Sequence, residues 1–135
     1  MNSKILAALA AIGLAVGCEH RGAYVPVTEP HAAAENFQTV VLLGEKLADS
    51  LAVEGQQAKY SDDGRLEVFA NLRNRVEKRL TVQVQTVFKD ENGFSTGDET
   101  AWETIIIPEL SQHSYHSIAQ NSKARKYTIR VRVQR

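Results

Sequence analysis

The chain has 135 residues, of which 43% are hydrophobic and 24% are charged. This length suits a single domain after a leader, and so much apolar material excludes wholesale disorder. Basic and acidic side chains number 16 each, so the balanced charge gives no basis for a nucleic-acid partner. The only cysteine is Cys18, which excludes a disulfide framework.

Residues 1–17 have the layout of a secretory signal peptide, with Lys4 ahead of an uncharged apolar run that ends at Gly17. The run is too short for a transmembrane helix, which needs roughly 20 apolar residues. Residues 15–18 resemble the lipobox of bacterial lipoproteins. That resemblance implies cleavage before Cys18, lipidation of its sulfur and acylation of its new amino group, which together anchor a protein stably. The alternative is an ordinary signal peptide followed by an incidental cysteine.

Glu19 follows the lipobox. In the enterobacterial sorting rule, an Asp at this position retains a lipoprotein in the inner membrane, so Glu19 predicts an outer-membrane lipid anchor with the domain facing the periplasm. Residues 18–36 include Pro26 and Pro30 and show neither the period of a strand nor that of a helix. We expect them to be a flexible tether to a domain over residues 37–135.

From residue 37 onward, apolar and polar side chains alternate in short runs. Turn signals stand between them at residues 61–64 and 90–93, and Leu47 begins a short helical turn or loop. The alternation slips near Thr86, which predicts a β-bulge. The predicted strands cover residues 37–43, 51–60, 66–72, 80–88, 102–107, 113–119 and 127–133.

About seven short strands, each with one polar face, predict an all-β fold. The first expectation is an Ig-like antiparallel β-sandwich that follows the signal peptide and the short tether. A small barrel is the alternative.

The order of motifs over residues 37–133 resembles the YcfL-like family of small bacterial lipoproteins. The motifs are an Asn-x-x-Asn-Arg turn at residues 71–75, a Phe-x-Asp-x-x-Gly hairpin at 88–93, Trp102, and a closing strand from Tyr127. The function of that family is not established, and the resemblance implies no catalytic residue. Some members are similar to gene neighbours of lipoprotein activators of peptidoglycan synthases, which implies a role in envelope biogenesis.

Histidines and serines near the C-terminus are the candidates for chemistry. His113 and His116 are three residues apart on a predicted strand, so their rings diverge, and no carboxylate cluster completes a metal site. Ser111, Ser114 and Ser117 lack the Gly-flanked turn of a nucleophile elbow. We therefore predict that the protein is not an enzyme and has no metal and no cofactor.

The last strand carries the strongest charge asymmetry, because residues 123–135 contain no acid. If this strand is an edge, Lys126, Arg130 and Arg132 offer a basic surface to an anionic glycan or lipid headgroup. The alternative is that these charges protect the edge from aggregation.

These features predict a non-enzymatic interaction or scaffold module in envelope biogenesis. The lipid anchor attaches it to the membrane, and an envelope protein is the expected partner. The alternative is a binding module for an anionic cell-wall or lipid ligand, which contacts the basic C-terminal strand.

Overall fold

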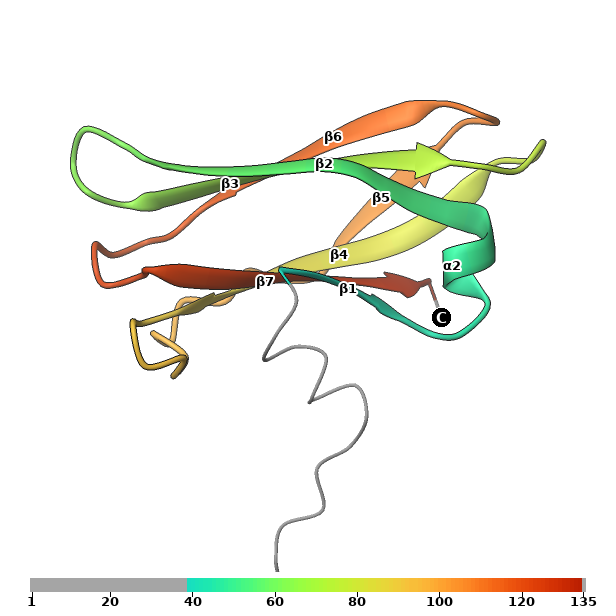
Figure 1. Ribbon diagram of the computed structural model, residues 1–135. Helices are drawn as coiled ribbons and strands as arrows, with labels where there is room; N and C mark the ends of the chain where they lie inside the picture. The colour runs from blue at the N-terminus through green and yellow to red at the C-terminus, as the bar shows by residue number, and fades with distance from the viewer. Residues whose placement is uncertain (1–38, 135) are drawn as a thin grey trace, which may run out of the picture.

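The computed structural model describes residues 39–134, which form two stacked β-sheets and one short helix at one end of them (Figure 1). The predicted signal peptide (1–17) and tether (18–36) lie outside the described residues. The elements are β1 (Val40–Leu43), α2 (Leu47–Ser50), β2 (Leu51–Tyr60), β3 (Leu66–Asn74), β4 (Leu80–Lys89), β5 (Glu103–Ile107), β6 (Gln112–Ile118) and β7 (Lys126–Val133).

The strands pair in two separate sheets, with the orders β1-β7-β4-β5 and β2-β3-β6. This confirms the predicted all-β sandwich of seven strands. All strand pairs are antiparallel except β1 with β7, which run parallel. Parallel neighbours need a long connection, and here every other strand of the domain lies between them in sequence.

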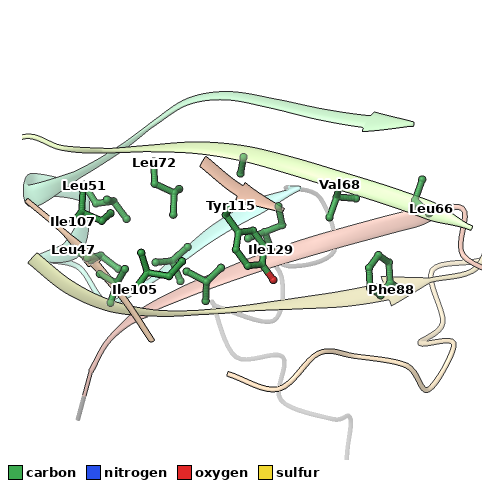
Figure 2. Packing of buried hydrophobic residues seen from close by; sticks show 14 of the residues in the cluster. Leu47, Leu51, Leu66, Val68, Leu72, Phe88, Ile105, Ile107, Tyr115 and Ile129 are labelled. Carbon is green, nitrogen blue, oxygen red and sulfur yellow. The ribbon is translucent and has the colours of Figure 1, made fainter. Parts of the chain in front are cut away.

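The core fills the space between the sheets (Figure 2). In β3 the buried residues Leu66, Val68, Ala70 and Leu72 alternate with more exposed ones, as their spacing predicts. α2 closes one end of the sandwich because Leu47 is buried in the same cluster. The core is therefore one continuous apolar layer to which both sheets contribute.

The β-bulge predicted near Thr86 is wrong. β4 pairs with β7 in unbroken register from Val82 to Lys89, and Thr86 is fully buried. The alternation slips in the sequence only because a hydroxyl group occupies a core position. The register shift of the described sheets lies instead in β2, between Val53 and Gly55.

Asn74 ties the turn after β3 to the end of β5. Its side chain is fully buried, and Oδ1 accepts a hydrogen bond of 3.0 Å from the N–H of Val76. Nδ2 lies within hydrogen-bond distance of three carbonyl oxygens, those of Lys78, Ile107 and Pro108, at 2.7, 3.1 and 3.0 Å. The asparagine-arginine turn in the sequence is therefore a structural motif.

Candidate interaction surface

β7 is a central strand, because β1 pairs with one side of it and β4 with the other. The condition considered from the sequence, that β7 is an edge strand, is not met, and the arginines of β7 do not protect a free edge. The sequence conceals this arrangement, because β1 is only four residues long and lies at the opposite end of the domain.

The basic residues of β7 nevertheless share one surface. Successive side chains of a strand point to opposite faces of the sheet. In β7, the buried Ile129 and Val131 point into the core, so the side chains at even-numbered positions point the other way; these include Lys126, Arg130 and Arg132. They therefore lie on the outer face of the β1-β7-β4-β5 sheet, along about 20 Å of strand.

Lys89 adds a fourth cation that the sequence interpretation missed. It lies directly opposite Lys126 in the β4–β7 register, and its Nζ donates a hydrogen bond of 3.0 Å to Thr128 Oγ1. The phase of β4, in which Val84 and Phe88 are buried, was a signal that could have placed it on this face. We call Lys89, Lys126, Arg130 and Arg132 the basic face.

Trp102 lies against both arginines. The guanidinium carbon of Arg132 is 3.8 Å from the centroid of the Trp102 ring, and that of Arg130 is 5.8 Å from it. Both distances are within the range of cation–π interactions. We call these three residues the Trp102–arginine cluster.

Glutamine side chains of β4 hold the two guanidinium groups in place. Arg132 Nε donates to Gln83 Oε1 at 2.9 Å, and Arg130 Nη1 donates to Gln85 Oε1 at 3.1 Å. Among residues 39–134, no carboxylate oxygen lies within 4.0 Å of the Arg132 guanidinium nitrogens. The Arg132 charge is therefore oriented but not neutralised by a neighbouring acid of the described chain.

The loop between β4 and β5 brings Trp102 to this face. The N–H of Thr100 donates to Thr86 O at 3.0 Å, and the Thr100 hydroxyl accepts from the N–H of Thr86 at 2.9 Å. Farther back, the buried carboxylate of Asp98 accepts a hydrogen bond of 2.9 Å from the N–H of Gln120. These bonds attach the loop to β4 and to the end of β6, which fixes the position of Trp102.

Residues 38–133 match the family described as "Protein of unknown function (DUF1425)". The chain belongs to the DUF1425 family. This match is compatible with the lipoprotein-family resemblance of the sequence and, like it, leaves the function open.

Two solved structures share the fold of this DUF1425 chain. Campylobacter jejuni cj0090 superposes with a TM-score of 0.61 at 21% identity, covering 71% of this chain and 98% of that one. A DUF1425 family member from Shewanella sp. pv-4 superposes with a TM-score of 0.58 at 19% identity, covering 63% and 79%. At sequence identities this low, the similarity of the structures shows only that the fold is shared. No match was found among curated proteins.

The two candidate histidines of this DUF1425 chain, His113 and His116, lie on opposite faces of β6, as their spacing predicts. His113 shares the phase of the buried Tyr115, whereas His116 is exposed and stacks on Phe69 with ring centroids 4.5 Å apart. His116 Nε2 is 3.9 Å from Glu67 Oε2. Within residues 39–134, no three His, Cys, Asp or Glu side chains are grouped as a metal site would require.

The three candidate serines do not converge. Each hydroxyl donates to a different partner, at 3.0 Å for Ser111, 2.8 Å for Ser114 and 2.8 Å for Ser117. The acceptors are Glu109 O, Asn71 Oδ1 and Thr86 Oγ1, respectively. The described fold does not bring these serines to a histidine.

Among residues 39–134 of this DUF1425 chain, three groups have shifted pKa values. Hydrogen bonds from Ser61 and then Arg65 lower the pKa of Asp63 in the β2–β3 turn. A hydrogen bond to Glu54 raises the pKa of Arg73, and burial raises the pKa of Tyr127. All three shifts have local structural causes.

None of the described helices has the length and apolar character needed to cross a bilayer.

Proposed function

We propose that this protein is a lipid-anchored, non-enzymatic interaction module that binds an envelope protein through the Trp102–arginine cluster. The observation that supports it best is the fixed placement of one Trp and two Arg side chains on one sheet face. Trp and Arg are enriched among the residues that dominate protein–protein binding. Because Gln83 and Gln85 already hold the guanidinium groups, binding costs less side-chain entropy.

In this proposal, Cys18 carries the lipid and residues 19–38 connect it to the domain at the outer membrane, on the periplasmic side. The described domain begins next to β1, the edge strand beside β7 in the sheet that carries the basic face. A connection of this length spans at most about 70 Å. The partner must therefore meet the domain close to the membrane, where anchoring raises the effective concentration.

Crosslinking and capture of the full-length protein from envelope fractions tests this function. We expect the parent chain to capture a defined protein and Trp102→Ala to capture it at least tenfold less well, because the loss of a hot-spot aromatic costs on the order of 2 kcal/mol. Phe94→Ala is the matched control, since Phe94 is 70% exposed and lies outside the cluster.

Equal capture by Trp102→Ala and the parent would contradict the cluster as the binding site. A Cys18→Ser variant tests the anchor separately, because it must move the protein from the membrane fraction to the soluble fraction. If its distribution equals that of the parent, the anchor is refuted while the result on Trp102 still stands.

A second candidate function, binding of an anionic cell-wall or lipid ligand, is supported by the charge of the same face. Lys89 and Lys126 lie directly opposite each other in the β4–β7 register, so two basic side chains share one end of this face. Arg130 and Arg132 extend the positive charge along β7. The face is basic although the whole chain has a formal net charge of zero.

Cosedimentation with isolated sacculi, and separately with vesicles containing anionic lipid, tests the second candidate. Lys126→Glu should weaken binding about tenfold, since each basic residue near an anionic surface contributes about 1 kcal/mol and the change also reverses the charge. Lys123→Glu changes the net charge equally but lies before β7, and it should retain most of the binding. Equal losses of binding in the two variants would refute the proposal that the basic face is the specific binding site.

A further inference from the structure

Within residues 39–134 the sandwich has four edge strands, and three of them carry features that oppose pairing with another chain. β1 has only four residues. β2 contains the register shift and carries exposed Glu54 and Lys59. β5 has only five residues, begins with the exposed Glu103 and is followed by Pro108. Short length, irregular backbone, charges and prolines all discourage the addition of a strand.

β6 lacks every one of these features. Its sequence, Gln-His-Ser-Tyr-His-Ser-Ile, contains no Pro, no Gly and no Lys, Arg, Asp or Glu. It pairs with β3 in unbroken register along its whole length. Among residues 39–134, only β3 hydrogen-bonds to the main chain of β6. Within the described chain, β6 is thus a regular edge without protection.

The ladder with β3 shows which main-chain groups of β6 point outward. Just beyond its two ends, Ser111 O accepts from Asn74 N–H and Ala119 N–H donates to Leu66 O, each at 2.9 Å. Since bonded and non-bonded pairs alternate along an antiparallel ladder, His113, Tyr115 and Ser117 bond to β3. The N–H and C=O groups at the free edge are then those of Gln112, Ser114, His116 and Ile118.

We propose that β6 pairs with β6 of a second copy of this chain, antiparallel about a two-fold axis at Tyr115. In this register Gln112 lies opposite Ile118 of the partner subunit, and Ser114 lies opposite His116 of the partner subunit. All four outward residues then find partners, with about eight hydrogen bonds in total. The two three-stranded sheets then become one continuous sheet. In any other symmetric register, some of the outward N–H and C=O groups of β6 remain without a hydrogen-bond partner.

Charge and geometry support a second copy as the occupant. β6 has no formal charge at neutral pH, so identical strands do not repel each other. A two-fold axis perpendicular to the joined sheet keeps both β1-β7-β4-β5 sheets on the same side of it. Both chains therefore enter at β1 from the same side, as two copies anchored in one membrane require, although the pairing itself does not depend on the anchor.

Disulfide trapping of the full-length chain in envelope membranes tests this pairing. The double variant Ser114→Cys/His116→Cys places the new sulfurs of the two copies opposite each other, with Cα atoms about 5.5 Å apart, which a disulfide can bridge. We expect a covalent dimer as the main product, reversed by reductant. Each single variant and the exposed loop variant Ser122→Cys should give at least tenfold less dimer. The parent chain controls for Cys18.

Charge variants test the same register without a disulfide. Ser114→Lys/His116→Lys places like charges opposite each other and should sediment as a monomer in detergent, whereas Ser114→Lys/His116→Glu places opposite charges together and should sediment as a dimer. Thermal unfolding verifies that both variants are folded. Equal sedimentation of the two variants, or a Cys variant trapped on a protein of another mass, would overturn pairing with a second copy.

Discussion

At the scale of single residues, Thr86 shows how a polar side chain can be part of the core. Its Oγ1 lies 2.9 Å from the Tyr115 hydroxyl and accepts a hydrogen bond of 2.8 Å from Ser117 Oγ. The bonds join β4 of one sheet to β6 of the other. Because a buried hydroxyl with partners costs little, the alternation of β4 continues without a bulge.

Thr86→Val should lower the free energy of unfolding by about 1–3 kcal/mol, because it leaves the buried Tyr115 hydroxyl without this partner. Tyr115→Phe added to Thr86→Val should recover part of the loss, since the buried Tyr115 hydroxyl is then removed and only the half-buried Ser117 hydroxyl lacks its former acceptor. Urea denaturation of the parent, both single variants and the double variant measures the coupling. If the losses in the free energy of unfolding of the two single variants add up to that of the double variant, the Thr86 and Tyr115 hydroxyls do not interact.

At the scale of elements, the position of a strand within its sheet determines which substitutions the strand tolerates. β7 has a partner on each side, so every main-chain N–H of its interior serves one ladder or the other. β6 has a described partner only on the β3 side. The sequences of β6 and β7 do not reveal this difference.

Proline substitutions separate the central strand from the edge strand. Arg130→Pro removes a ladder hydrogen bond inside β7 and should unfold the domain or cost about 3 kcal/mol or more. Ser114→Pro affects an N–H that points to the free edge and should leave the domain folded. Circular dichroism and thermal melting compare the two variants. A folded Arg130→Pro protein with an unchanged melting temperature would contradict the central position of β7.

At the scale of the whole molecule, the two sheets share a single core. Leu72 of β3, Val82 of β4 and Ile107 of β5 are all fully buried in it. Neither sheet can keep its apolar face covered without the other. We therefore expect the sandwich to unfold as one cooperative unit.

Leu72→Ala should destabilise the whole domain by about 2–5 kcal/mol, because it leaves a cavity between the sheets. Phe94→Ala, at a side chain that is 70% exposed, should change the stability by less than about 0.5 kcal/mol. Trp102 is the only tryptophan and lies outside the core, so its fluorescence reports on the outer face. In denaturant, fluorescence and circular dichroism should show coincident transitions, and separate transitions would contradict one cooperative unit.

The sequence by itself determined the number of strands, their approximate bounds and the sandwich class, because these follow from local alternation and turn residues. In β3, for example, the spacing of Leu66, Val68, Ala70 and Leu72 was enough to predict a half-buried strand. It also placed Arg130 and Arg132 on one face of the last strand. The lipid anchor at Cys18 remains a prediction from the leader alone.

Only the tertiary structure decided which strands are neighbours. The parallel pairing of β1 with β7 joins the two ends of the domain, and no local pattern encodes such a contact. For the same reason, the sequence could not bring Trp102 to Arg132 or Lys89 to Lys126, since these pairs meet only after the sheet has formed. Local periodicity sets the face on which each side chain lies, whereas the fold alone sets which side chains share a surface.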